Sequence, residues 1–334
     1  MNGILMIEIL MSDICWILGK EAERGSVLIA LDEIAWIGSK DRVFLGKLKI
    51  AWDRFFEKNP KLVFIVASSI ASWIDENILK STGFFGRVDL TLTLREIAAK
   101  DCTKFWGKRE KAVSSYEKLK LLSITGGVPK YLEAIDPKLT AEENVQNLCF
   151  SEEGLLFNEF DRIFHDLFSR RSKTYKEMVE VLAGTRALAQ KDLCVGINKA
   201  NGRKISEYLR DLTEAGFITA DFTWDLKTTK LSNLRKYRLS DNYLRFYLKY
   251  ILPNKQQIIK KKFKKTSIYS ASNWETIMGF QFENLVLNNS SDLFERLHIR
   301  SEDYDYDGPY FQTKTRERKG LSLIHISEPT RLGM

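Results

Sequence analysis

The sequence is poor in the residues that build disulfide frameworks and zinc sites. Its 334 residues include only three histidines and four cysteines, Cys15, Cys102, Cys149 and Cys194. No two cysteines stand at a C-x-x-C spacing, so neither a disulfide-stapled scaffold nor a zinc site is expected. Scattered, reduced thiols of this kind are typical of a cytoplasmic protein.

Long apolar runs are also missing. No stretch approaches the ~18 residues that a membrane-spanning helix needs, and Glu8 and Asp13 interrupt the apolar N-terminal segment. That segment has no basic start and no small-residue cleavage site, so a signal peptide is not expected. The chain is 44% hydrophobic and 29% charged, which is typical of a globular protein long enough for two domains.

Positive charge is concentrated in the second half of the chain. The net charge is +8, and the span Arg170–Ser240 holds 15 Lys/Arg against 8 Asp/Glu, a surplus of seven. Six further lysines lie between Lys255 and Lys265. Basic blocks of this kind indicate an anionic partner, nucleic acid first. For the second block, a solvated lysine-rich face is an equal alternative.

Two unbroken apolar runs predict buried strands of a parallel sheet. The first, VLIAL (27–31), ends in Asp32 and Glu33, and the second, within KLVFIVASS (61–69), ends in Ser68 and Ser69. Residues 41–59 between them carry apolar side chains at helical spacing. A third strand-like run, VDLTLTL (88–94), follows the turn GFFGR. Strand, helix, strand, short helix, strand is a doubly wound α/β pattern.

The polar residues that follow these strands suit phosphoryl transfer. An acid at a strand end can hold Mg²⁺ and a neighbouring acid can orient the attacking water, roles that fit Asp32 and Glu33. Ser68 or Ser69 could sense the γ-phosphate from the adjacent strand, and Arg87 could neutralise transition-state charge. The alternative is structural, because an acidic pair is also a common signal for the start of a helix.

Several blocks together resemble the archaeal-type AAA+ ATPases, which are STAND-related P-loop NTPases. The resemblance runs in order from about Ser26 to Gly320. It implies ATP and Mg²⁺ as ligands, with Asp32 and Glu33 in the second acidic motif, Ser68 and Ser69 on the sensor strand and Arg87 in the family's Gly-Arg pair. The matching blocks are VLIALDEIAWIG, FIVASSIASWI, TGFFGRVDLTLTLREI, ITGGVPKYLEAID and KYRLSDNYLRFYLKYILPN.

The phosphate-binding loop of this family, G-x-x-x-x-G-K-[ST], is not in the sequence. Gly19-Lys20 is followed by Glu21 and lacks the upstream glycine. We therefore expect residues 1–95 to be the C-terminal part of an ATPase core that begins inside that domain. The intact parent would be a nucleotide-driven switch that hydrolyses ATP, whereas this chain would bind ATP weakly or not at all. The alternative is a non-enzymatic binding module with a degenerate ATPase scaffold.

Two further regions are expected in the middle of the chain. Residues 96–168 resemble the family's helical lid, with a break at TGGVPKY, and residues 169–252 predict a winged helix-turn-helix. Its recognition helix would expose three acids, Glu207, Asp211 and Glu214, beside its basic residues, so contact with DNA and docking of a protein both stay open. The candidate nucleic-acid residues are Arg203, Lys204 and Arg210 on that helix, and Lys227, Lys230, Arg235 and Lys236 in the wing.

The C-terminal region, 253–320, resembles the start of a restriction-endonuclease-like domain. The resemblance implies that Glu283 is the first acid of a split metal site. A catalytic metal needs at least two carboxylates, and no second one is available here, so nuclease activity is not expected of this chain. Residues 321–334 begin with LSLIHISEPTR, which resembles translated sequencing adapter, so His325 is not a candidate site residue.

Overall fold

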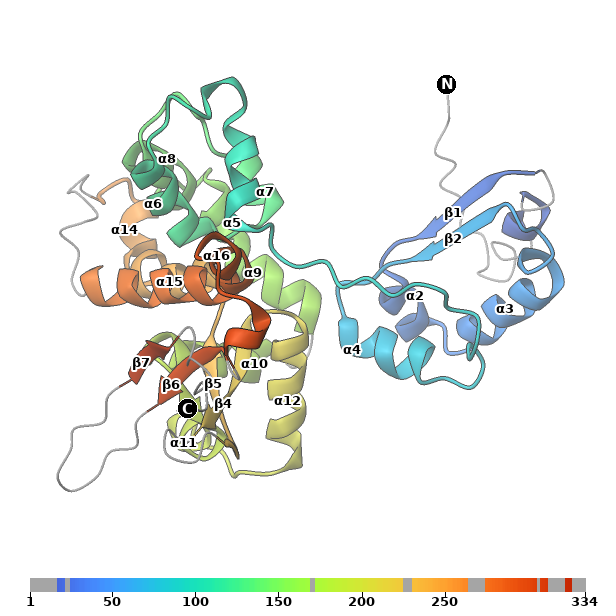
Figure 1. Cartoon of the computed structure of the whole chain (residues 1–334). Coiled ribbons are helices and arrows are strands. Elements are labelled where there is room, and N and C mark those ends of the chain that lie inside the picture. The colour runs from blue at the N-terminus through green and yellow to red at the C-terminus, as the bar shows by residue number, and fades with distance from the viewer. Residues whose placement is uncertain are drawn as a thin grey trace. The chain divides into compact units, whose positions relative to one another are not determined.

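The computed structural model describes residues 17–21, 25–168, 172–224, 230–263, 274–304, 307–311 and 322–325. The chain divides into two compact units, Met1–Thr93 and Leu94–Met334. Both are shown in Figure 1. No helix within the described residues has the length and hydropathy to cross a membrane.

The first unit is a small α/β layer built on two parallel strands. Strand β1 (Val27–Leu31) pairs with β2 (Leu62–Val66), so that Val27 lies opposite Leu62. The helices are α2 (Ile34–Lys40), α3 (Phe44–Ala51) with its π-helical extension η1 (Trp52–Phe56), and α4 (Ala71–Ile74) with η2 (Asp75–Leu79). The strands and the helix predicted over 41–59 are therefore present.

Only one face of this sheet is packed. Ile29 is buried against Phe44, Leu48 and Phe56, and the Phe56 ring stacks on Phe64 with centroids 5.1 Å apart. On the opposite face Leu28, Val63 and Ile65 are 65%, 54% and 47% exposed. A parallel sheet is normally covered on both faces, so this face is available to a further layer.

The prediction of a third strand over residues 88–94 is wrong for the described structure. Val88–Leu94 has no strand assignment, and Leu90, Leu92 and Leu94 are 72%, 71% and 92% exposed. An alternating pattern forms a strand only where a neighbouring edge accepts its backbone hydrogen bonds. Within the described residues no such edge lies beside this segment, which joins the two units.

The second unit is mostly helical. Residues 96–168 form α5 (Ala99–Cys102), the 3-10 segment η3 (Thr103–Arg109), α6 (Ser115–Thr125), α7 (Pro129–Glu133), α8 (Ala141–Cys149) and α9 (Leu155–Phe168). Helix α8 begins with a capping box in which Thr140 and Glu143 satisfy each other's backbone N–H groups. We refer to this part as the lid region, although its role as a lid stays a prediction.

The next part combines three helices with a three-stranded antiparallel sheet of order β3-β5-β4. We call it the three-helix region, and its winged-helix assignment stays a prediction. It contains α10 (Ser172–Ala183), β3 (Leu188–Ala189), α11 (Gln190–Gly196), α12 (Arg203–Glu214), β4 (Ile218–Trp224) and β5 (Leu231–Leu239). Helix α12 buries Ile205, Tyr208, Leu209 and Leu212, the apolar stripe expected of an amphipathic helix.

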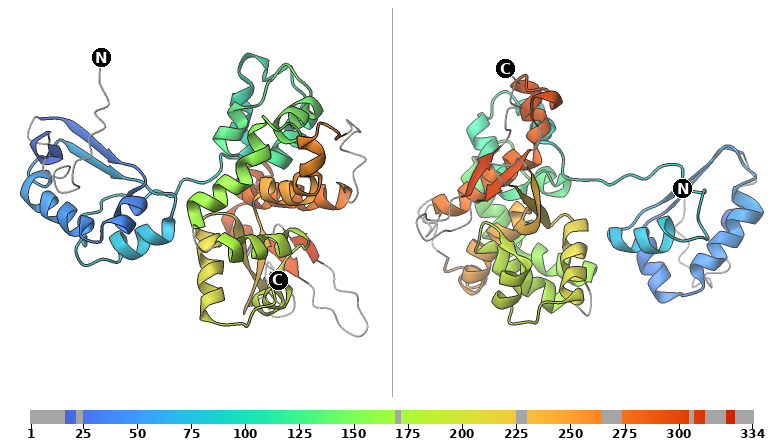
Figure 2. Two further views of the ribbon diagram at one scale, coloured as in Figure 1. Left: turned by 180° about the vertical axis from the view of Figure 1, so that it is seen from behind. Right: turned by 60° about the horizontal axis from the view of Figure 1, so that its bottom comes forward.

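The chain then returns to the lid region. The elements are α13 (Asn242–Phe246), η5 (Tyr247–Ile251), η6 (Leu252–Asn254), α14 (Lys255–Ile259), α15 (Trp274–Asn288), α16 (Ser290–Arg296) and η8 (Ser301–Asp303), followed by β6 (Gly308–Phe311) and β7 (Ser322–His325), an antiparallel pair. One buried apolar cluster runs from Cys102 to Ile277. It takes side chains from both regions and from α13, and Figure 2 gives two further views of the ribbon.

The turn after α6 needs two glycines, Gly126 and Gly127, because the first residues of the second unit pass close to its backbone. A Cβ on Gly127 would lie 2.0 Å from the Ile97 carbonyl oxygen, and the Ile97 N–H donates to the Gly127 carbonyl at 2.9 Å. Gly126 has φ +57°, and a Cβ there would lie 2.7 Å from the Glu96 carboxylate oxygens. The two blocks LREI and TGGVPKY are therefore neighbours in space.

Candidate functional site

The carboxyl ends of β1 and β2 lie at the same edge of the sheet because the strands are parallel. The Ala67 N–H donates to the Leu31 carbonyl at 2.9 Å, and the Ile34 N–H donates to the Ala67 carbonyl at 3.0 Å. These bonds fix the two segments that follow the strands against each other. Ligands of open α/β sheets bind at this edge.

Glu33 and Ser69 meet there. The Ser69 hydroxyl donates to Oε2 of Glu33 at 2.9 Å, and the Asp32 carboxylate accepts the Glu33 N–H at 2.9 Å. Glu33 has φ 50° and ψ 41°, the left-handed conformation. For a residue with a Cβ this costs on the order of 1 kcal/mol, so the sheet edge holds Glu33 in a strained backbone position.

Ser68 has a different contact. Its hydroxyl accepts the Ile70 N–H at 3.1 Å, which supports the turn that leads into α4. Ser69, rather than Ser68, is therefore the serine that reaches the acidic pair. The sequence pattern did not distinguish the two.

Arg87 is bonded elsewhere in the unit. Its Nη2 lies 2.9 Å from Oδ1 of Asp53, and its Nη1 donates to the Gly83 carbonyl at 3.2 Å. Lys49 binds the other oxygen of Asp53 at 2.9 Å, and the hydrogen bonds from Lys49 and Arg87 lower the pKa of Asp53. In the described structure the Arg87 guanidinium therefore contacts Asp53 rather than Asp32 or Glu33.

The donor set at the sheet edge suits magnesium. Asp32 and Glu33 are exposed, and together with the Ser69 hydroxyl they present oxygen atoms alone. Mg²⁺ is usually held by one or two carboxylates while water and phosphate oxygens complete its shell. Within the described ranges no group of three or more His, Cys, Asp or Glu residues could hold a metal ion.

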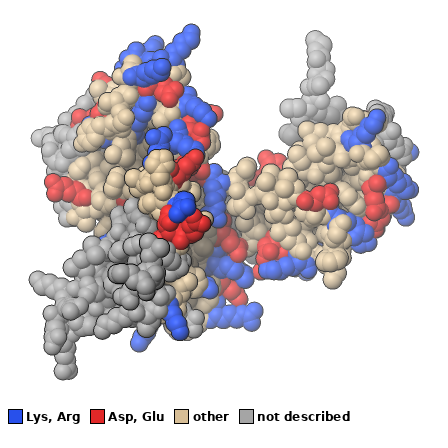
Figure 3. Space-filling view, viewed as in Figure 1, with Lys and Arg blue, Asp and Glu red and all other residues tan. Residues whose placement is uncertain are grey.

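The predicted recognition helix is electrically balanced. Arg203 pairs with Glu207 at 3.1 Å, Arg210 lies 3.8 Å from Glu214, and the Tyr175 hydroxyl donates to Asp211. Figure 3 shows blue and red side chains next to one another over the position of α12. Lys204 is exposed on the same helix. Acids that are this close to the basic residues weaken attraction to a phosphate backbone.

The residues of the predicted wing differ in their surroundings. Lys230 is exposed, the Arg235 guanidinium lies 4.8 Å from the centre of the Phe222 ring, and the Lys236 ammonium lies 4.7 Å from that of Phe311. Burial lowers the pKa of Lys236. Lys227 lies outside the described residues.

Two acids with raised pKa values, Glu96 and Asp241, do not stand out in the sequence pattern. Glu96 accepts the Gly127 N–H at 3.1 Å, and burial raises its pKa. Asp241 caps α13 by accepting the Leu244 N–H at 2.8 Å. Burial first, and the charge of Glu96 second, raise the pKa of Asp241 to about 7. The capping pattern of Asp241 is readable locally, but its proximity to Glu96 is not, because the two are far apart in sequence.

Comparison with known proteins gives the class of fold. The chain has a mixed α/β structure, mostly helical with a small parallel sheet, that is similar to the fold of a Walker-type, or P-loop, ATPase. The particular solved structure is the Walker-type ATPase PABY2304 of Pyrococcus abyssi, with a TM-score of 0.53 and 16% identity, over 74% of this chain and 71% of that one. At this identity the likeness concerns the fold alone.

A curated relative is the uncharacterized protein MJECL04 of Methanocaldococcus jannaschii. It is 26% identical over 233 residues, which are 68% of this chain and 49% of that protein. The chain therefore spans about half the length of this relative. No family model matches the sequence.

Proposed function

We propose that these residues belong to an ATPase that binds ATP and Mg²⁺ and acts as a nucleotide-driven switch. The observation that carries the proposal is the hydrogen bond from Ser69 to Glu33, which brings the ends of two parallel strands together at a ligand-binding edge. The similarity to a Walker-type ATPase fold supports a nucleotide as the ligand.

Each polar residue has a role in this proposal. Asp32 holds the metal, which when bound supplies positive charge to the phosphates. Glu33 accepts a hydrogen bond from the attacking water and orients it, and the Ser69 hydroxyl holds the Glu33 carboxylate in position. Arg87 would have to leave Asp53 before it could reach a nucleotide, whether its own or that of a neighbouring subunit.

A phosphate-binding loop from outside these 334 residues is part of the proposal. The sequence contains no G-x-x-x-x-G-K-[ST], and the sheet has an open apolar face formed by Leu28, Val63 and Ile65. A βα unit that carries the loop would cover that face. By itself the chain binds ATP weakly, because backbone N–H groups of such a loop supply much of the affinity for phosphate.

The partner of the switch would dock on the three-helix region. This region belongs to residues 169–252, which are proposed to form a winged helix. DNA and protein are the two candidates. The ion pairs Arg203–Glu207 and Arg210–Glu214 favour a protein on α12, whereas the wing residues favour an anionic partner. The second candidate function is a non-enzymatic binding module in which the first unit serves only as a scaffold.

The test uses the longer protein, with the upstream coding sequence restored. Glu33→Gln should lower the ATP turnover number by roughly 10²–10⁴-fold and leave the Kd for a fluorescent ATP analogue unchanged. Glu57→Gln is the matched control, because Glu57 is an exposed acid of the same unit. Equal loss of binding and turnover would remove Glu33 from the water-orienting role. A restored reading frame without the phosphate loop would leave only the binding module.

A further inference from the structure

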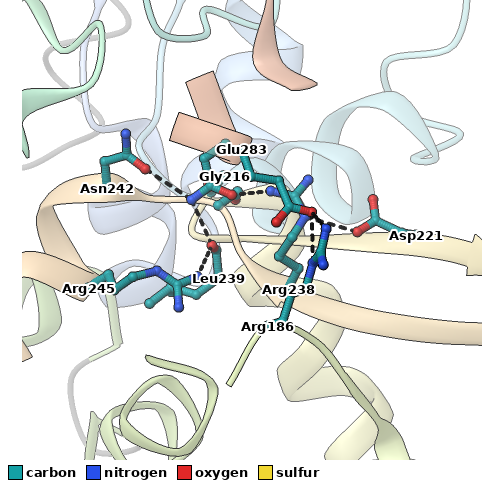
Figure 4. Close-up of polar contacts among 10 residues, drawn as sticks. Arg186, Gly216, Asp221, Arg238, Leu239, Asn242, Arg245 and Glu283 are labelled. Atoms are coloured by element: carbon teal, nitrogen blue, oxygen red, sulfur yellow. Dashed lines mark hydrogen bonds and ion pairs between the residues drawn. The ribbon is translucent and has the colours of Figure 1, made fainter. Parts of the chain in front are cut away.

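Helix α15 carries three buried polar side chains. Gln281, Glu283 and Asn284 are 0%, 4% and 1% exposed. A buried polar group without a hydrogen-bond partner lowers the stability of the fold. The partners of these three side chains therefore identify the parts of the unit that α15 holds together. Figure 4 shows the contacts around Glu283.

One set of bonds joins α15 to the three-helix region. Oε1 of Glu283 accepts from Nε of Arg186 at 3.0 Å and from Nη2 at 2.8 Å, and Arg186 lies between α10 and β3. Asn284 donates to the Leu239 carbonyl at 3.0 Å and accepts from the Arg238 guanidinium.

A second set joins α15 and the start of α16 to the lid region. Gln281 donates to the Ser123 carbonyl on α6. The Ala99 N–H donates to Oδ1 of Asn289 at 2.7 Å, and the Lys100 ammonium lies 2.6 Å from Asp292. The same pair of helices therefore contacts both regions through side chains only a few residues apart.

The surroundings of Glu283 do not fit a metal. Among the described contacts, Arg186 binds Glu283 and Arg238 binds Asp221, and the Arg245 guanidinium lies in the same network (Figure 4). Burial first, and the charge of Arg238 second, lower the pKa of Arg245 to about 10, while the charge of Glu283 acts in the opposite direction. A divalent cation would be repelled by these guanidinium groups, which already occupy the carboxylates of Glu283 and Asp221.

We infer that α15 is a clamp that holds the lid region and the three-helix region together as one body, and that Glu283 is its ionic anchor to Arg186 rather than a metal ligand. The shared apolar cluster from Cys102 to Ile277 agrees with one body. Rearrangement within the second unit would first have to break this network.

The experiment compares Glu283→Gln with Glu275→Gln in the full chain. Both changes are on α15, but Glu275 is exposed. Glu283→Gln removes the charge of a buried carboxylate that pairs with the partly buried Arg186, so the Tm of this variant should fall by roughly 6 °C or more. Amide exchange should rise both around Ser123 and around Leu239. The double variant with Arg186→Gln should lose little more than either single variant, because the two changes remove one interaction.

Two results would overturn the inference. One is a Tm and exchange pattern for Glu283→Gln equal to those of Glu275→Gln. The other is a rise in the Tm of the unaltered protein with Mn²⁺ that Glu283→Gln abolishes, which would show a metal at Glu283. Neither readout involves ATP, so the outcome is independent of the proposed ATPase function.

Discussion

The carboxyl group of Asp241 provides a sharp test of the electrostatics of the second unit. Its ordinary pKa is 3.8, and in the folded protein burial and the charge of Glu96 raise it to about 7. The fold therefore favours the protonated form. Stability from this source is fully present below pH 3.8 and is lost as the pH rises through 7, because the unfolded chain ionises freely.

The size of the effect follows from the two pKa values. Each pKa unit corresponds to about 1.4 kcal/mol, so a rise from 3.8 to about 7 corresponds to about 4 kcal/mol at most between pH 4 and pH 8. Asp241 is only partly buried by surface area, and water reduces the penalty. We therefore expect about 2 kcal/mol, to which Glu96 adds in the same direction.

Asp241→Asn isolates this charge, because asparagine caps a helix as well as aspartate does. The variant should match the unaltered protein near pH 4. At pH 8 it should be more stable by about 2 kcal/mol, or roughly 4–8 °C in Tm for a unit of this size. Asp241→Ala is the control for the cap and should cost about 1 kcal/mol at low pH.

The assay is thermal or urea unfolding measured from pH 4 to pH 8. If Asp241→Asn keeps the same dependence on pH as the unaltered protein, the carboxyl group is not held protonated by the fold. A variant that is less stable at pH 8 would show that the charge itself is needed there, and the reasoning from burial would be refuted.

Two further predictions concern the Gly-Gly turn and the wing. Gly127→Ala places a Cβ 2.0 Å from the Ile97 carbonyl oxygen, so urea unfolding should show a loss of roughly 2–3 kcal/mol; a loss below 0.5 kcal/mol would show that the two segments separate easily. If the wing binds DNA, reversing the charge of Lys230, Arg235 and Lys236 should flatten the plot of log K against log salt by up to about three contacts, whereas the exposed Lys108 is a control that should leave the slope unchanged.

The helices and strands that were predicted correctly are those that depend on the spacing of apolar residues along a short stretch of sequence. The apolar runs that became β1 and β2 are continuous, and helical spacing in α3 and α12 places their apolar residues on one face. The candidate site at the sheet edge could be anticipated because Asp32 and Glu33 directly follow β1, and Ser69 lies three residues after the end of β2.

The parts that escaped prediction depend on contacts between distant residues. Residues 88–94 alternate like a strand, but no edge in the described structure pairs with them. Arg87 follows a glycine in a familiar pattern, yet its partner is Asp53, 34 residues earlier. Glu283 resembles a metal ligand in sequence, but the guanidinium that binds it lies 97 residues away.

At Glu33, which has a left-handed backbone, the residue best for stability differs from the residue that a carboxylate site requires. Glycine would adopt this conformation without strain and would make the turn more robust, but it would bring no carboxylate to the sheet edge. If stability alone were under selection, residue 33 would tend to become glycine. An acid that is kept at this position in related proteins would therefore indicate that its carboxylate is needed for chemistry rather than for folding.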